Sequence, residues 1–349
     1  MNGTNADTSQ QCAPASIGGM TSTLDRRQFI AVLGAGAASA AASAATASSA
    51  TTASSAQDGA WTDAARGRAL PWRLRLPAAP GPWPLLLYSH GLGGSRDGGE
   101  VWGRAWADAG FAVLHLQHPG SDTDTLRGGL ASLRAAGSAQ QLIARAADLS
   151  FMLDETERRA RADEAPWRDM QPGVVGVAGH SFGAHTTLAV AGQRYPAPGS
   201  LADARPRAFV ALSPSSPAAS RISLLQSFGG IVRPMLAITG SLDGDPFGSY
   251  DGGEPRAAVF EGLPAGRRAL LWLDGADHMT FGGGRPGSVR DFGPFRRKGM
   301  APSLEPAHHA MVARITTLWW RAQLLGDETA RAALVAPEGL AAGDRWRIG

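Results

Sequence analysis

The sequence has 349 residues, of which 44% are hydrophobic, 18% charged and 7% aromatic. This composition excludes collagen, a long disordered chain and a multi-span membrane protein, and it allows one large domain or two small ones. The net charge of +3 is nearly neutral for this length, so we expect no nucleic-acid partner. The single cysteine, Cys12, excludes an internal disulfide framework and a cysteine-based zinc site.

Residues 1–56 do not resemble domain material. The paired arginines Arg26 and Arg27 precede an aromatic residue and the short, alanine-rich run 29–45, a pattern typical of a bacterial twin-arginine export signal. Small residues near Ala56 could precede cleavage, although earlier Ala-Ser-Ala sites compete. We therefore expect export through the twin-arginine machinery to the periplasm or beyond, with no stable membrane insertion after cleavage. An uncleaved flexible leader or a membrane anchor is the alternative.

From residue 57 onward, short apolar runs alternate with longer amphipathic stretches, which predicts one α/β catalytic domain over residues 57–349. Two segments, 119–137 and 281–306, are expected to be long loops. The expected strands are 72–76, 85–88, 111–116, 174–178, 208–212, 235–239 and 269–273, and the expected helices are 101–109, 139–161, 186–192 and 307–325.

The segment Gly179-His180-Ser181-Phe182-Gly183 fits the pattern G-x-S-x-G. It stands between a predicted strand and a predicted helix, which is the setting of a nucleophile elbow. Glycines two residues either side of the serine suit a tight turn that neighbouring elements crowd. The turn would present Ser181 Oγ above the edge of the sheet. An ordinary glycine-rich turn is the alternative.

A serine hydroxyl is a weak nucleophile, so it needs a base, and the base needs an orienting acid. In a fold with a nucleophile elbow the chain order is Ser, then Asp or Glu, then His. Asp243 follows the predicted strand 235–239 and is the candidate acid, with Asp245 as the alternative in the same loop. His278 follows the next predicted strand and is the candidate base. The alternatives are a turn aspartate and a surface histidine.

The transition state of an acyl transfer to such a serine also needs hydrogen-bond donors for its oxyanion. The turn 89–94 follows a predicted strand, and its glycines allow backbone N–H groups to point into a pocket. We assign the oxyanion hole to the N–H groups of Leu92 and Phe182. His90, in the same turn, is expected to brace the loop rather than to take part in the reaction.

Other histidines and aromatic residues have structural explanations. His115 and His118 have a ligand-like spacing, but no cysteine and no clear carboxylate partner joins them, so we expect no metal there. The pair His308 and His309 begins a predicted helix and is expected to be a cap or a surface pair. Three phenylalanines of the second long loop either line an acyl pocket or anchor that loop: Phe281, Phe292 and Phe295.

The chain from about Trp61 to Leu325 resembles the α/β-hydrolase superfamily. Within it, the sequence is most similar to the bacterial group of plasma-type platelet-activating-factor acetylhydrolases and dienelactone-hydrolase-like proteins. The resemblance implies an eight-stranded, mostly parallel sheet flanked by helices, and ester hydrolysis by the three residues above without a cofactor. Dienelactone hydrolases proper use a cysteine nucleophile where this chain has Ser181, so that narrow activity is not expected. Three segments carry the likeness: 63–71, 88–95 and 179–184.

The sequence therefore predicts an exported serine hydrolase that cleaves carboxylic esters through an acyl-enzyme on Ser181, with neither metal nor cofactor. The substrate would be a small-molecule, lipid or polyester ester. One alternative is a polyester or lipid hydrolase with an open cleft, including an activity like that of platelet-activating-factor acetylhydrolase. Others are a secreted binding protein that keeps the fold without turnover, and a metal-dependent hydrolase.

Overall fold

The computed structural model describes residues 54–196, 199–215, 222–284 and 304–349. All of these residues belong to one unit of the chain, Ala50–Gly349. The arginine pair of the predicted export signal, and the candidate pocket residues Phe292 and Phe295, lie outside the described residues.

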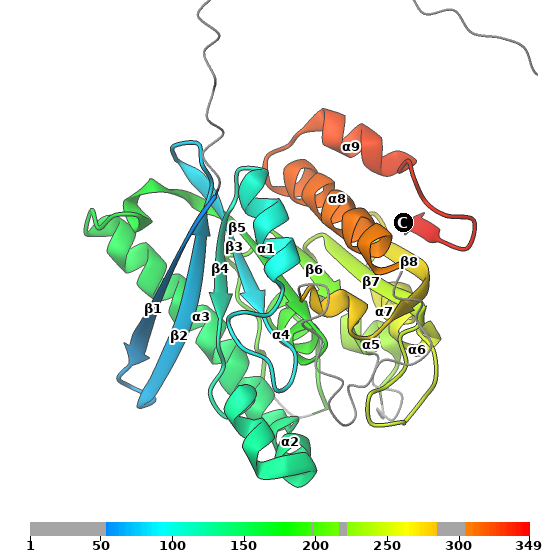
Figure 1. Cartoon of the computed structure of the whole chain (residues 1–349), viewed down its shortest axis with the longest axis horizontal. Coiled ribbons are helices and arrows are strands. Elements are labelled where there is room, and N and C mark those ends of the chain that lie inside the picture. Colours follow the sequence, from blue (N-terminus) through cyan, green and yellow to red (C-terminus); the bar gives the residue numbers. More distant parts are fainter. Residues whose placement is uncertain (1–53, 197–198, 216–221, 285–303) are drawn as a thin grey trace, which may run out of the picture. The chain divides into compact units, whose positions relative to one another are not determined.

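In the described residues a mixed, mostly parallel sheet of nine strands forms the centre of the fold (Figure 1). Its strand order is β1-β2-β4-β3-β5-β6-β7-β8-β9. The pairings from β4 to β8 are parallel, whereas β1, β2 and β9 join the two edges in antiparallel pairs. The predicted α/β class is confirmed, but the sheet has one strand more than the eight that the resemblance implied. The strands are β1 (Ser55–Asp63), β2 (Arg68–Leu76), β3 (Trp83–Ser89), β4 (Ala112–Leu116), β5 (Met170–His180), β6 (Ala208–Leu212), β7 (Met235–Leu242), β8 (Arg268–Asp277) and β9 (Arg345–Ile348).

Helices cover both faces of the sheet, which is why its central strands are apolar throughout. Leu85 and Leu87 of β3 point into one core cluster, and Leu86 and Tyr88 point into the other. The first cluster lies under α3 (Ala139–Arg161), α4 (Phe182–Ala191), α5 (Leu224–Phe228) and α7 (Val259–Gly262). The second lies under α1 (Glu100–Asp108), α8 (Glu305–Leu324) and α9 (Glu328–Val335), with α1 and α8 side by side (Figure 1).

The remaining helices are short, and two of them lie inside a segment that we expected to be a loop. These two, η1 (Thr123–Gly128) and α2 (Gly129–Ala136), correct the prediction for 119–137. The others are η2 (Trp167–Asp169), α6 (Glu254–Ala257) and η3 (Thr280–Gly282). Among the described residues, no helix is long and apolar enough to cross a membrane.

The bounds of α3 agree with the predicted helix 139–161 because its start signal and its apolar stripe are both local. Ser138 caps the helix by accepting a hydrogen bond from the N–H of Gln141. Leu142 and Leu149 are buried on one face of the helix, and Leu149 belongs to the core cluster against the sheet. This same face also buries Arg145 and Asp148, two charged side chains that the apolar pattern did not reveal.

Removal of the large indole of Trp320 tests the packing of α8. Trp320 is fully buried and its ring meets Trp106 of α1 edge to face, with the ring centroids 5.8 Å apart. We expect Trp320→Ala to lower the free energy of unfolding by about 3–5 kcal/mol, because the cavity it leaves cannot collapse fully. Urea denaturation measures this loss. Val335→Ala is the control: Val335 is 67% exposed, and its loss should change stability by less than about 0.5 kcal/mol. Equal effects of the two variants would contradict the packing described here.

Candidate active site

Ser181 occupies a sharp turn between β5 and α4. Its backbone has φ 55° and ψ −117°, a conformation that costs energy for a residue with a side chain. The turn presses on the backbone of β3, since a Cβ placed on Gly183 would lie 1.9 Å from the carbonyl oxygen of Ser89. A Cβ on Gly179 would lie 2.2 Å from the carbonyl oxygen of Gly183. Both positions therefore accept glycine alone, which gives the G-x-S-x-G spacing its physical reason.

The structure brings Ser181, His278 and Asp243 together, each directly after the end of a parallel strand. His278 Nδ1 lies 2.9 Å from Asp243 Oδ1. Because a carboxylate oxygen can only accept, Nδ1 carries the proton and Nε2 is left with a lone pair. Ser181 Oγ donates to that lone pair over 2.9 Å. The alternative acid, Asp245, instead accepts a hydrogen bond from the N–H of Ser249.

The Asp243 carboxylate is fully buried and is held by several groups at once. Its Oδ1 accepts from Ser213 Oγ at 2.8 Å, and its Oδ2 accepts from Thr239 Oγ1 at 2.9 Å. Arg256 Nε lies 2.9 Å from Oδ1 as an ion pair. Burial acts to raise the pKa of Asp243, but the Arg256 cation and the hydrogen bond from His278 outweigh it and lower that pKa. The acid therefore stays ionised at neutral pH.

Ser213 is a member of the site that the sequence did not reveal. Its Oγ lies 2.8 Å from Asp243 Oδ1 and also 2.8 Å from His278 Nδ1. Since its hydroxyl proton goes to the carboxylate, its oxygen can share the Nδ1–H of His278 with Asp243, so Ser213 joins the acid to the base. One clue was present: Ser213 directly follows β6, as Asp243 follows β7.

Arg256 of α6 binds the loops that follow β6 and β7, and its charge acts on His278. Burial and then the Arg256 cation lower the pKa of His278, while the hydrogen bond and charge of Asp243 act to raise it. The net lowering keeps His278 neutral, and so able to accept a proton, at neutral pH. His180 steadies the same residue, because its Nε2–H donates to the carbonyl oxygen of His278 at 2.9 Å. The guanidinium of Arg256 donates to Asp243 O, Ser213 O, Pro214 O, Gly244 O and Ser215 Oγ.

Two histidines of α8 hold the loop that carries His278. His308 Nε2 donates to the carbonyl oxygen of Asp274 at 2.9 Å, and His309 Nε2 donates to that of Thr280 at 3.1 Å. Both side chains are buried. The expectation of a cap or surface pair was therefore wrong, because the carbonyl groups they bind belong to a segment about thirty residues earlier, beyond the reach of a local pattern.

Phe281 follows the candidate base and is fully buried in the core cluster under α1 and α8. The indole N–H of Trp102 donates to the carbonyl oxygen of Phe281 at 3.1 Å. Of the two roles predicted for this residue, the structure therefore favours that of an anchor for its segment.

The predicted oxyanion donors lie on both sides of the serine. Phe182 is the first residue of α4, so its N–H has no partner within the helix. A Cβ placed on Gly91 would lie 3.4 Å from Ser181 Cβ, so the turn that carries Leu92 passes directly beside the serine. The two N–H groups after Leu92 donate to carbonyl oxygens, whereas no described residue accepts from Leu92 itself.

The imidazoles of the neighbouring strand ends have separate partners. His90 braces its turn as expected: Nδ1–H donates to the carbonyl of the next residue at 2.6 Å, and Nε2 accepts from the N–H of His118 at 3.0 Å. His118 Nδ1 donates to Asp148 at 2.9 Å. The expectation that no carboxylate joins this histidine was therefore wrong, because the partner lies thirty residues away in the chain. His115 Nδ1 donates instead to the carbonyl of Gly98. In the part of the chain that the structure describes, no group of three or more His, Cys, Asp or Glu residues could hold a metal ion.

No protein-family model matches the sequence, and a search of curated proteins found no match. The site is therefore interpreted from its own geometry. That geometry combines a strained serine, a neutral imidazole beside it, a buried carboxylate behind the imidazole, and backbone N–H groups on either side. Such a set can activate a hydroxyl group and can stabilise a negatively charged oxygen.

Replacement of Arg256 tests the electrostatics of the site without reference to any activity. We expect Arg256→Met to raise the pKa of His278, because the imidazolium would no longer face a buried cation while Asp243 remains ionised. An NMR titration of protein with labelled histidine measures this pKa, with His278→Gln used to assign the resonance. Arg205→Met is the control, since Arg205 pairs with Asp203 and Asp154 elsewhere. An unchanged or lowered pKa in Arg256→Met would contradict the arrangement.

Proposed function

We propose that this chain is a serine hydrolase of the α/β-hydrolase fold that cleaves carboxylic esters through an acyl-enzyme on Ser181. One observation carries the proposal: the hydrogen-bonded series from Ser181 through His278 to Asp243, with Ser181 on a strained turn. The positions of the three residues after β5, β7 and β8 agree with the chain order that this fold uses.

In the first half of the reaction, His278 Nε2 takes the hydroxyl proton as Ser181 Oγ bonds to the ester carbonyl carbon. The carbonyl electron pair moves to its oxygen, and the N–H groups of Leu92 and Phe182 stabilise the oxyanion. The tetrahedral intermediate then collapses, and the C–O bond to the alcohol breaks. The leaving alkoxide takes the proton from His278, which leaves an acyl ester on Ser181.

In the second half, a water molecule gives a proton to His278 and attacks the acyl carbon. The second tetrahedral intermediate releases the carboxylic acid, and Ser181 recovers its proton. Asp243 stays ionised throughout and stabilises the imidazolium that forms in each half. Each reaction cycle consumes one ester and one water molecule and releases one carboxylic acid and one alcohol. No step requires a metal ion or a cofactor.

We also propose export through the twin-arginine machinery, on the sequence of Arg26 and Arg27 and the run that follows. β1 begins at Ser55, so cleavage after Ala56 would remove the first two residues of that strand. One of the earlier Ala-Ser-Ala sites would leave β1 whole. The pairing of Ser55 with Leu76 and of Ala56 with Arg75 supports cleavage at such an earlier site.

Loss of the serine tests the proposed reaction directly. We expect the full chain to hydrolyse p-nitrophenyl acetate and butyrate, and Ser181→Ala to reduce kcat by roughly 10⁴–10⁶-fold. A fluorophosphonate probe should label the wild type and not this variant. Ser200→Ala, at an exposed position, should retain both properties. A wild-type chain that neither turns over esters nor takes the probe would contradict the proposal and favour a binding protein.

The two neighbouring aspartates separate the triad acid from a turn residue. We expect Asp243→Asn to lower kcat by roughly 10³–10⁴-fold, because it removes the charge that orients and stabilises His278. Asp245→Asn should retain most of the activity, since this side chain bonds to the N–H of Ser249 instead. Steady-state kinetics of the two variants gives the comparison. A larger loss in Asp245→Asn would reverse the assignment.

A further inference from the structure

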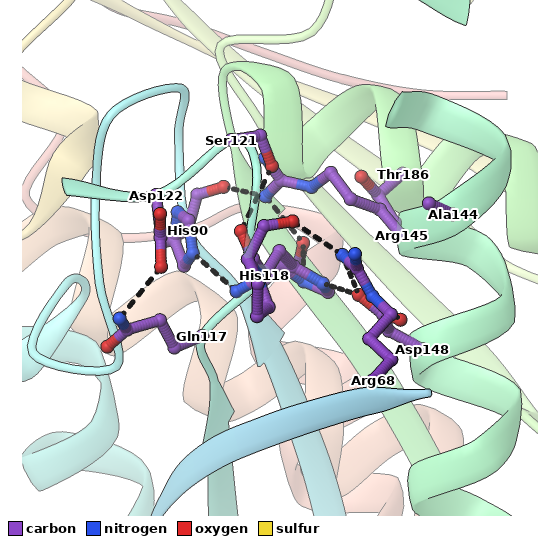
Figure 2. A network of polar contacts seen from close by, with 12 residues as sticks. Arg68, His90, Gln117, His118, Ser121, Asp122, Ala144, Arg145, Asp148 and Thr186 are labelled. Carbon is purple, nitrogen blue, oxygen red and sulfur yellow. Dashed lines mark hydrogen bonds and ion pairs between the residues drawn. The ribbon is translucent and has the colours of Figure 1, made fainter. Parts of the chain in front are cut away.

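A second Ser–His–Asp series is buried at the end of β3, and Figure 2 shows its His118 and Asp148 within a network of polar contacts. Ser89 Oγ lies 3.0 Å from His118 Nε2, and His118 Nδ1 lies 2.9 Å from Asp148 Oδ2. All three side chains are fully buried. Burial and the nearby Arg145 cation lower the pKa of His118 to about 4, so this imidazole is neutral. The contacts repeat those of the candidate triad, but no substrate can reach this serine.

The oxygen of Ser89 is also occupied from its other side. The guanidinium of Arg145 donates to Ser89 Oγ at 3.1 Å. It also donates to Ser121 Oγ at 3.3 Å and to the carbonyl oxygen of His90 (Figure 2). Burial lowers the pKa of Arg145 to about 9, and the side chain is therefore still a cation at neutral pH. The Ser89–His118–Asp148 series is therefore hydrogen-bonded to the Arg145 cation, and the hydrogen bond to Ser89 helps to fix the position of the guanidinium.

Arg145 contacts the turn that carries Leu92 and also the side chain of Phe182. It binds the carbonyl of His90, two residues before Leu92, and its guanidinium carbon lies 4.7 Å from the centre of the Phe182 ring. The carbonyl of Gly91 is likewise bound, by His90 Nδ1. These two hydrogen bonds fix the backbone of the turn just before Leu92, whose own N–H has no acceptor among the described residues.

The charge of Arg145 has no carboxylate hydrogen-bonded to it among the described residues. Asp148, one turn further along α3, is paired instead with Arg66 and Arg68, at 2.8 Å and 2.7 Å. Burial acts to raise the pKa of Asp148, but the hydrogen bond from His118 and the contacts with Arg68 lower it well below its ordinary value. The charges of Asp148 and Asp122 act on Arg145 without a direct hydrogen bond, and its cation lies beside the turn that carries Leu92. A positive charge in that place can stabilise negative charge that develops there.

We propose that Arg145 is a positioning residue of the oxyanion hole, which the buried Ser89–His118–Asp148 series holds against the turn that carries Leu92. The hydrogen bond from its guanidinium to the His90 carbonyl positions the backbone of that turn, and the guanidinium plane packs against the Phe182 ring. Its positive charge favours the anionic intermediate over the neutral ester. This inference rests on the proposed ester hydrolysis.

The experiment compares Arg145→Gln and Arg145→Lys with a matched arginine elsewhere. Arg268 lies at the other end of β8 from His278 and makes the same kinds of contact. Its guanidinium lies 4.5 Å from the Phe260 ring centre and donates to the carbonyl oxygens of Phe260 and Leu263. Arg268→Gln therefore removes a comparable clamp without touching the oxyanion turn.

The readouts are kcat and KM for p-nitrophenyl acetate, and the inhibition constant of a trifluoromethyl ketone that forms an oxyanion on Ser181. Active sites are counted with a fluorophosphonate, so that unfolded protein does not enter kcat. We expect Arg145→Gln to lower kcat roughly 10–100-fold with little change in KM, and to weaken ketone binding by the same factor. Arg145→Lys keeps the charge but not the fork, and should lose less. Arg268→Gln should keep wild-type kcat per active site.

Wild-type kcat in Arg145→Gln, or the same loss in Arg268→Gln, would overturn the proposal. So would a loss of kcat with unchanged ketone binding, because the defect would then lie outside the oxyanion hole. If Arg145→Gln does not fold, full activity and ketone affinity in Arg145→Lys would overturn it, and a parallel loss of both would support it. A wild-type chain without turnover or labelling would instead be a failure of the proposed function itself.

Discussion

The carbonyl oxygen of Ser89 leaves no room for a side chain on Gly183, and the positions of the other groups in the site depend on this contact. It presses the turn after β5 onto the end of β3, where Ser89 pairs with Gly179 in the parallel ladder. The strained backbone of Ser181 is thus supported by the sheet. Because the side chain of Ser89 bonds to Arg145, one residue links the elbow above it to the buried network below.

Two buried carboxylates, Asp243 and Asp148, are stabilised by the same kinds of partner. Each faces arginine and each accepts a hydrogen bond from the Nδ1–H of a neutral imidazole. A buried charge that loses its partner costs about 3–5 kcal/mol, so each pair restricts its loops to one arrangement. The two series differ in solvent exposure: Ser181 is partly exposed, whereas Ser89 is fully buried.

Sequence patterns located the elements and residues whose determinants are local. The helix 139–161 has its cap and apolar stripe within its own length, and Ser181, Asp243 and His278 each follow an apolar strand directly. β1 was missed because its first residues are exposed at the edge of the sheet and show no apolar alternation.

The supporting groups of the site could not be found in this way, because their partners are far away in the chain. Arg145 meets His90 across 55 residues, and Ser213 meets Asp243 across 30. An arginine that is buried under a loop and one that lies in solvent look the same in a local pattern. The reversed expectation for His308 and His309 has this cause as well, since burial there depends on a loop that only the folded sheet brings near.

His308 and His309 also anchor the chain on either side of His278 to α8. Their hydrogen bonds to Asp274 and Thr280 grip the loop on both sides of the base, from a helix that begins at Glu305. The position of the base is then set by α8 and β8, not by the length of chain that joins them. Contacts from two elements that are far apart in the chain thus hold the imidazole from two directions.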